Sequence, residues 1–285
     1  MKILLRKPVG FTGLRSIRLT ETAMKNELFK IGPFTVYGYG LMIAIGVLAA
    51  YGVGEYRARK YERGEYGQGT DGTAGIKADH VFDFVIWCVV GGFLGAKILY
   101  LITDIRNIWA NPSIVLNIAD GWVVYGGIIG GILSAMLYSR IHGLRFLAYF
   151  DLLIPSVALA QGFGRIGCFL AGCCYGRETD SPFAVVFHEA EYAPNGVPLV
   201  PTQLISSGLD FLNFFVLVWL SKRKKADGQI GALYLVFYSI GRFVLEFYRG
   251  DLIRGSVGAL STSQFISLFT VAAGGILVFW CGRKK

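Results

Sequence analysis

The sequence is poor in charged residues for its length. They make up 16% of its 285 residues, whereas 54% are hydrophobic and the mean hydropathy is +0.51. This profile is too apolar for a soluble domain of this size. The net charge of +9 would suggest nucleic acid binding in a soluble protein, but here it indicates membrane orientation instead. We therefore predict a membrane protein that binds no nucleic acid.

Cysteine and histidine are also scarce. The cysteines are too few and too scattered for a disulfide-stabilised secreted domain: Cys88, Cys168, Cys173, Cys174 and Cys281. The three between residues 168 and 174 could hold a metal, form a disulfide or carry out redox chemistry. Because the three histidines lie in distant connectors, zinc is disfavoured and no metal site is predicted. A structural role in close helix packing is the preferred interpretation, followed by a disulfide.

Seven stretches are long and apolar enough to cross a bilayer, which requires roughly 20 mostly apolar residues per helix. They cover about residues 36–55, 81–103, 122–138, 146–164, 203–220, 230–248 and 264–280. Polar, glycine-rich or charged connectors separate them, and no internal repeat interrupts the pattern. The sequence predicts an all-α polytopic membrane protein, with about seven transmembrane helices in a single domain over residues 24–285.

The charge of the connectors sets the direction of these helices. Lysine and arginine concentrate in the cytoplasmic connectors of membrane proteins. The basic residues on one side are Arg57, Arg59, Lys60, Arg63, Lys77, Arg140, Arg145, residues 222–225 and residues 283–285. The N-terminus is therefore predicted outside and the C-terminus in the cytoplasm. The long outer loop at about residues 177–201 could form a lid or head over a cavity, or be a plain connector.

The first 23 residues do not fit this orientation. They hold basic side chains that the rule would keep inside, among them Lys2, Arg6, Arg15 and Arg18. The stretch also lacks the apolar core and cleavage site of a signal peptide. A chain that begins at Met24 would be nearly charge-balanced before the first helix. We predict that residues 1–23 are a disordered extension or belong to a misassigned start.

Several ionisable side chains lie inside the apolar stretches, where each costs at least a few kcal/mol on insertion scales. They are Lys97, Arg165, Arg242, Glu246 and Arg249. The predicted direction places all of them near the outer leaflet, at the level of Tyr39 and Tyr125. Snorkelling to the interface would explain Lys97 or Arg249 alone. A structural i,i+4 ion pair would explain Arg242 and Glu246.

Arg165 is the strongest candidate for function among them. It lies in the run GFGRIG, residues 162–167, where glycines let backbones approach a charged group, an arrangement suited to an anion. On another helix, Arg242 is expected to be held by Glu246 and Arg249 to be free for a phosphate, the anion that a guanidinium matches best. An outer cavity with such arginines most simply binds a phospholipid head group.

Residues 164–177, GRIGCFLAGCCYGR, resemble the signature of the prolipoprotein diacylglyceryl transferases, bacterial enzymes that lipidate lipoprotein precursors. The likeness extends over nearly the whole chain from Met24. It includes residues 32–34, 39–43, 91–97, 125–130, 201–204 and 242–249. The family's seven spans and outer N-terminus agree with the topology derived above. Cysteine-bearing versions of the signature are typical of the clostridial branch, which this sequence resembles.

The resemblance implies transfer of the diacylglyceryl group of phosphatidylglycerol to the lipobox cysteine of a preprolipoprotein. A thioether forms, glycerol phosphate leaves, and no cofactor is required. Partners would be phosphatidylglycerol, preprolipoprotein signal peptides and membrane lipids, in the bacterial cell membrane with the site toward the outer leaflet. The catalytic residues carried over by position are Arg165, Arg242, Tyr125 and Tyr39. The phospholipid-binding residues would be Arg165, Arg242, Arg249, Glu246, Lys97, Gly176 and Gln203.

The sequence departs from the family pattern at Tyr125, where most members have a histidine. It also has Cys168 for the usual asparagine, Cys173 for glutamate and Val200 for histidine. Because a phenol is a poor base at neutral pH, nearby cations could instead lower the pKa of the incoming thiol, with Tyr125 orienting the lipid. Two alternatives stay open: a noncatalytic relative that binds or moves an anionic phospholipid, and a thiol oxidoreductase built on the cysteines.

Overall fold

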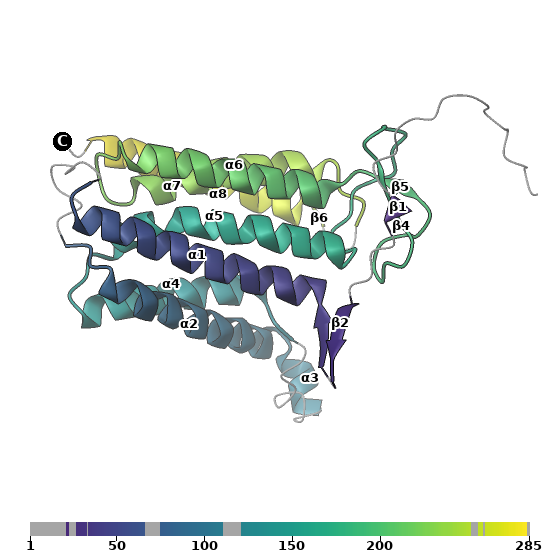
Figure 1. The fold of residues 1–285 in the computed structure, drawn as a ribbon, viewed down its shortest axis with the longest axis horizontal. Helices are drawn as coiled ribbons and strands as arrows, with labels where there is room; N and C mark the ends of the chain where they lie inside the picture. The colour runs from purple at the N-terminus through teal and green to yellow at the C-terminus, as the bar shows by residue number, and fades with distance from the viewer. Residues whose placement is uncertain are drawn as a thin grey trace, which may run out of the picture.

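The structure, a computed structural model, describes residues 21–22, 27–32, 34–65, 75–110, 121–251, 256–258 and 260–283. It is built from helices (Figure 1). The long ones are α1 (Gly38–Glu62), α2 (Asp79–Thr103), α4 (Val124–Ile141), α5 (Phe146–Leu170), α6 (Thr202–Ser221), α7 (Gln229–Glu246) and α8 (Thr262–Arg283). The predicted helical polytopic fold is confirmed, with one long helix for each predicted stretch. The short helix α3 (Ile105–Ala110) was not predicted.

Six of the long helices within the described residues are long and apolar enough to cross a membrane. The exception is α7, which has 18 residues but carries Arg242 and Glu246. Neighbouring helices pack in the order α1, α5, α6, α7 and α8, and α2 packs along α4. Figure 1 shows α2 and α4 together on one side of α1 and α5, with α6, α7 and α8 on the other side.

Glycines hold α2 and α4 in backbone contact. A Cβ atom added to Gly91 would lie 2.9 Å from the carbonyl oxygen of Gly130, and one on Gly95 would lie 2.8 Å from the Cα of Gly130. Gly126 meets the carbonyl oxygen of Gly95 in the same way. Small residues four apart permit such close approach of membrane helices. The glycines of segments 91–97 and 125–130 therefore have a packing role.

We expect Gly95→Ala to destabilise the protein by about 1–3 kcal/mol, because the two backbones must move apart to admit the methyl group. Gly92→Ala is the matched control, since its Cβ would meet nothing closer than the Gly127 carbonyl oxygen at 3.4 Å. That variant should stay within about 0.5 kcal/mol of the parent. Unfolding in detergent measures both, and equal effects would show that the glycine contact does not matter.

The α2–α4 pair joins the bundle at one end. This end, called the basic end below, carries the connectors at residues 57–77, 140–145 and 222–225. A buried apolar cluster there unites four helices and the connector before α2: Ala58, Tyr61, Ile76, Val81, Phe84, Ala135, Tyr138, Ala148, Tyr149 and Leu152. Among the described residues, no such cluster joins α2 and α4 to the bundle at the opposite end.

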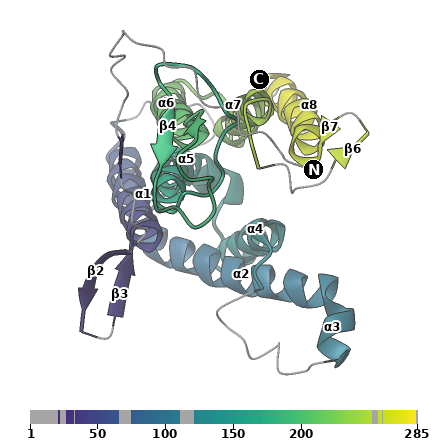
Figure 2. The same ribbon diagram turned by 90° about the vertical axis from the view of Figure 1, so that its right-hand side faces the viewer.

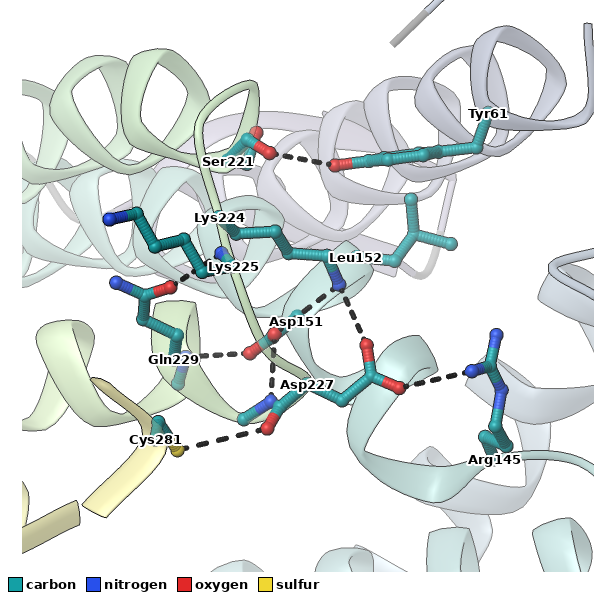
Figure 3. Close-up of polar contacts among 12 residues, drawn as sticks. Tyr61, Arg145, Asp151, Leu152, Ser221, Lys224, Lys225, Asp227, Gln229 and Cys281 are labelled. Atoms are coloured by element: carbon teal, nitrogen blue, oxygen red, sulfur yellow. Dashed lines mark hydrogen bonds and ion pairs between the residues drawn. The ribbon is translucent and has the colours of Figure 1, made fainter. Parts of the chain in front are cut away.

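A buried ionic network closes the basic end (Figure 3). The carboxylate of Asp151 on α5 accepts hydrogen bonds from the backbone N–H groups of Gly228 at 2.8 Å and Gly231 at 2.9 Å, at the start of α7. The Nζ atom of Lys224 lies 3.4 Å from Asp151 and 3.2 Å from Asp227. A carboxylate at a helix N-terminus is favoured by the exposed amides and the helix dipole. The network therefore attaches α7 to α5.

Two of the cations that set the predicted direction are structural. The side chain of Lys224 is only 6% exposed, because Asp151 and Asp227 enclose it. Arg57 belongs to α1 rather than to a connector and is buried, and its guanidinium donates to the Leu152 carbonyl oxygen and, at 3.0 Å, to the Ser221 hydroxyl. The assignment of Arg57 to a connector is wrong, whereas Lys224 lies in the predicted connector between α6 and α7.

The loop after α5 forms a small head with its own core. Strand β4 (Val185–Phe187) pairs antiparallel with β5 (Pro198–Leu199) and parallel with β1 (Glu21–Thr22). The buried apolar residues of the head are Val185, Phe187, Ala193 and Leu199. Of the two readings of this loop, a folded head is confirmed and a plain connector is wrong. A position over a cavity stays a prediction.

The remaining strands form hairpins next to helices. Strands β2 (Glu27–Ile31) and β3 (Phe34–Tyr37) precede α1, and β6 (Ser256–Val257) and β7 (Leu260–Ser261) precede α8. Residues 1–20 lie outside the described residues, so most of the prediction for residues 1–23 stays a prediction. Two of residues 1–23 are described, those of β1, and they pair with β4 of the head rather than being disordered.

Candidate active site

The two arginines singled out from the sequence line one cavity between α5, α6 and α7. Arg165 enters it from α5 and Arg242 from α7. The other lining residues are Ser206, Leu209, Asp210, Asn213, Phe237, Tyr238, Gly241 and Leu245. A second hollow, at the basic end between α1 and α2, is lined by Glu55, Arg59 and neighbouring residues and contains no predicted site residue. The arginine cavity is therefore the candidate site.

Arg165 is the unpaired cation of this cavity. Within the described part of the chain its guanidinium makes no hydrogen bond or ion pair. It interacts electrostatically with Tyr238, Cys168 and Asp210, but none of these groups forms a bidentate hydrogen-bonded pair with it. A guanidinium presents five N–H donors that match the oxygens of a phosphate. Arg165 is thus available for an anionic ligand.

The expected ion pair of α7 is present. The Nη2 atom of Arg242 lies 2.8 Å from Oε2 of Glu246 and donates to the Ser263 hydroxyl at 2.9 Å. Despite this ion pair, no N–H group of the described residues points at Oε2, so this buried oxygen accepts no hydrogen bond. Since buried acceptors are normally satisfied, Oε2 of Glu246 is a place for a hydroxyl donor of a ligand.

The prediction that Arg249 is free for a phosphate is wrong. Its Nε donates to Oδ1 of Asp251 at 2.7 Å and its Nη2 to Oδ2 at 2.5 Å, which is a bidentate pair. Although burial opposes the charge, these hydrogen bonds raise the pKa of Arg249 above its ordinary value. The Arg249–Asp251 contact could not be predicted from the sequence, because it depends on the turn after α7 that brings Asp251 back to the arginine.

Gly176 lies where three segments cross. It forms an antiparallel bridge with Arg249, and the Arg177 N–H donates to the Tyr248 carbonyl at 2.9 Å. A Cβ atom at Gly176 would lie 2.8 Å from Cβ of Val200 and 2.9 Å from Cγ2 of Thr202. This crowding explains why a glycine occupies position 176, because only a residue without a side chain lets the segment after α7 approach. Direct contact of Gly176 with lipid stays a prediction.

The cysteines gather at the turn that ends α5. Gly172 has a φ of +70°, its N–H donates to the Phe169 carbonyl at 3.1 Å, and the Cys173 N–H donates to the Cys168 carbonyl at 3.1 Å. This is a Schellman motif, in which the side chains of the two residues joined by the longer hydrogen bond also meet. Those residues are Cys168 and Cys173, so helix termination itself brings the first two thiols together.

Cys174 completes the group through an unfavourable backbone. Its φ is +60°, the only positive value at a described non-glycine residue, and the left-handed conformation costs such a residue roughly 1–2 kcal/mol. The three Sγ atoms lie within 4.8 Å of one another. Hydrogen bonding with Cys168 and Cys174, and then burial, raise the pKa of the Cys173 thiol.

Gln203 belongs to this turn. Its Nε2 donates to the Cys173 carbonyl at 2.8 Å, and the neighbouring Thr202 hydroxyl donates to the Cys174 carbonyl at 3.0 Å. Gln203 is buried, and its Oε1 has no partner among the described residues. The structure thus gives this predicted lipid-binding residue a structural contact: it fixes the cysteine turn from the first turn of α6.

Tyr39 joins the site from α1. It lies in the first turn of that helix, close enough to Arg165 and the three cysteines to interact with them electrostatically. The close approach depends on Gly167, where an added Cβ would lie 3.2 Å from the Tyr39 ring. The sequence expectation that Tyr39 and Arg165 reach the same depth agrees with this placement.

Lys97 and Tyr125 do not meet the arginines. Both belong to the α2–α4 pair, and Tyr125 is 52% exposed. The Nζ atom of Lys97 lies 5.3 Å from the Tyr100 ring centroid and 5.5 Å from that of Trp122. Among the described residues, neither side chain lines the arginine cavity. The expectation that all seven residues gather stays a prediction for these two, and the helix pair that carries them shares its described apolar cluster with the bundle at the basic end.

Two site residues were missed by the sequence analysis. Asp210 and Asn213 of α6 line the arginine cavity and are 5% and 7% exposed. Oδ2 of Asp210 and both polar side-chain atoms of Asn213 have no hydrogen-bond partner in the described chain. Polar residues three apart inside an apolar span were the available signal, since membrane helices turn such residues toward the bundle interior.

Comparisons with known proteins agree with the resemblance. Residues 26–280 match the sequence model of the prolipoprotein diacylglyceryl transferase family. A phosphatidylglycerol–prolipoprotein diacylglyceryl transferase of Clostridium tetani is 47% identical over 92% of this chain and 99% of its own length. Relatives of the same name from Clostridium perfringens and Coxiella burnetii are 44% and 34% identical over 92% and 90% of the chain, and over 97% and 95% of their own lengths. The chain belongs to the prolipoprotein diacylglyceryl transferase family.

Proposed function

We propose that this protein transfers the diacylglyceryl group of phosphatidylglycerol to the sulfur of a lipobox cysteine in a preprolipoprotein. The names of its relatives specify the same donor and acceptor classes. The observation that carries the proposal is the unpaired guanidinium of Arg165 beside Arg242 in a cavity between membrane helices. A phospholipid head group can enter a basic pocket of this kind from the bilayer.

The reaction is a displacement at the glycerol carbon that carries the phosphate. The sulfur of the acceptor forms the new C–S bond, the C–O bond to phosphate breaks, and glycerol phosphate leaves with the electron pair. Negative charge grows on the phosphate, so fixed cations aimed at it lower the barrier. Arg165 supplies that cation, with Arg242 held next to it by Glu246 and Ser263. The free Oε2 of Glu246 suits a hydroxyl of the glycerol head group.

The membrane arrangement belongs to the same proposal. The site lies where α5 and α7 end, opposite the basic end, so cytoplasmic basic connectors place it toward the outer leaflet with the N-terminus outside. Arg242 of α7 faces the cavity formed with α5 and α6 and is paired with Glu246, which lets α7 act as a seventh span. The lipid-facing surface includes the exposed apolar side chains of Phe93, Leu94 and Ile98 on α2. The cell membrane is the proposed location.

A noncatalytic lipid-binding role is the second candidate. One observation favours it: Tyr125 is exposed on a separate helix pair, and the described site contains no histidine to act as a base. Such a protein would use Arg165 and Arg242 to hold the phosphate without breaking a bond. Its affinity for phosphatidylglycerol would equal that of a transferase, but it would form no product.

The test uses the purified full chain, phosphatidylglycerol in detergent and a lipobox peptide with one cysteine. Mass spectrometry should find a diacylglyceryl adduct on that peptide and none on the matched peptide with serine. Replacing phosphatidylglycerol by phosphatidylethanolamine should reduce the product strongly. Bound phosphatidylglycerol without any adduct would contradict the transferase and support the lipid-binding role.

A further inference from the structure

The three cysteines at the end of α5 have a geometry that close packing alone does not require. Their Sγ atoms lie within 4.8 Å of one another. The Schellman motif pairs Cys168 with Cys173, and the left-handed backbone at Cys174 adds the third sulfur. A strained backbone that persists at a site is a reason to look for function there.

This geometry fits a thiophilic metal ion. Zinc–sulfur bonds of about 2.3 Å place thiolates about 3.8 Å apart in a tetrahedron, so small side-chain rotations would bring the three sulfurs to bonding distance. Three protein ligands with one position left open are the pattern of catalytic zinc sites, whereas structural sites use four. The other two cysteines, Cys88 and Cys281, do not belong to the group.

We propose that Cys168, Cys173 and Cys174 bind a thiophilic divalent cation of the Zn²⁺ class, whose open position takes the thiol of the acceptor peptide. Three thiolates and Zn²⁺ carry a net charge of −1. Arg165 interacts electrostatically with Cys168 and Cys174 and can compensate that charge, whereas Arg249 beside Cys174 is already paired with Asp251.

The surroundings of the turn hold the ligands in place. Gln203 and Thr202 donate to the carbonyls of Cys173 and Cys174, and the Gly250 N–H donates to the Tyr175 carbonyl at 3.1 Å. Some residues orient metal ligands without binding the metal themselves. Replacing such residues commonly lowers metal affinity by about 10–100-fold. The turn is therefore fixed from α6 and from the segment after α7 before any ion arrives.

The role in catalysis rests on the proposed function. A thiol that coordinates the cation loses its proton to solvent and becomes a thiolate, the nucleophilic form. That sulfur would attack the glycerol carbon as the C–O bond to phosphate breaks, and glycerol phosphate would leave with that electron pair. The product thioether is neutral and a poorer ligand, so it departs and reopens the position. No oxidant or reductant is needed, and the absence of a histidine from the described site is no obstacle.

The first experiment measures metal binding without activity. The purified, reduced full chain is stripped with a chelator and titrated with Co²⁺, whose thiolate complexes absorb in the near ultraviolet. We expect one equivalent to bind, and Cys168→Ser and Cys173→Ser to weaken binding by more than about 100-fold. Cys88→Ser and Cys281→Ser, at cysteines outside the group, are the matched controls and should bind as the parent does. No thiolate absorption in the parent, or equal loss in the controls, would overturn the proposal.

The second experiment tests the open position. Adding the lipobox cysteine peptide to the Co²⁺-loaded chain should increase the thiolate absorption by about one third, as a fourth sulfur joins three, and the serine peptide should not. An unchanged spectrum with the cysteine peptide would overturn the role in thiol binding. Because neither readout needs product, a chain that shows both and yields no adduct would contradict the transferase and leave the metal site standing.

Discussion

Arg165→Ala is expected to lower the rate of diacylglyceryl transfer by about 10²–10³-fold, the usual effect of removing a group that stabilises developing charge. The phosphate leaves from the cavity that Arg165 lines, and Arg165 is the guanidinium there that no described carboxylate holds. Arg242 cannot replace it, because Arg242 is committed to Glu246 and Ser263. The rate of adduct formation on the lipobox peptide measures the effect.

The variant should fold, which makes the result interpretable. Arg165 makes no hydrogen bond or ion pair with the described residues, so its removal leaves no hydrogen-bonded partner unsatisfied. Arg165→Lys keeps the charge but loses the planar fork, and should recover only part of the rate. Arg106→Ala, at an exposed arginine of α3, is the matched control and should transfer at the parental rate. An Arg165→Ala chain with parental activity would exclude this arginine from the reaction.

Asp151→Ala is expected to destabilise the protein by about 3–5 kcal/mol, the cost of breaking a buried charge pair by removing one partner. The variant would leave Lys224 enclosed without one of its two counter-charges and the N–H groups of Gly228 and Gly231 without an acceptor. Figure 3 shows Asp151, Lys224 and Asp227 converging where α5 meets the connector before α7. Denaturant or thermal unfolding in detergent measures the loss.

The control for this effect is Asp180→Ala, because Asp180 is an exposed carboxylate of the head and should change stability by less than about 0.5 kcal/mol. A double variant, Asp151→Leu with Lys224→Met, should be more stable than Asp151→Ala, since apolar replacement of both partners of a buried pair is often tolerated. Equal stability of the parent and Asp151→Ala would mean that the network does not hold α7 to α5.

Most of the predicted site residues fall into two groups, one on α1, α5 and α7 and the other on the α2–α4 pair. Arg165, Arg242, Glu246 and Tyr39 were found from the sequence, because a charge or a phenol at a given depth of an apolar stretch is a local property of the chain. Figure 2, which views the bundle from the end that holds the site, shows α2 and α4 as a layer apart from α6, α7 and α8. Lys97 and Tyr125 were assigned to the site by depth and by the family resemblance, and depth does not determine which layer a residue belongs to.

The sequence by itself determined the helices, their order and the family. Twenty apolar residues in a row must form a helix in lipid, because every backbone polar group needs an internal partner there. The signature around Arg165 is equally local, so it could be recognised without coordinates.

Only the tertiary structure decided which side chains meet. Arg249 is paired with Asp251 through a turn, Asp210 and Asn213 face the arginine cavity because of the rotation of α6, and the three thiols converge because two residues adopt positive φ angles at the end of α5. Each of these contacts depends on a backbone angle or a helix rotation that packing across the bundle selects. Hydropathy and spacing carry no information about either.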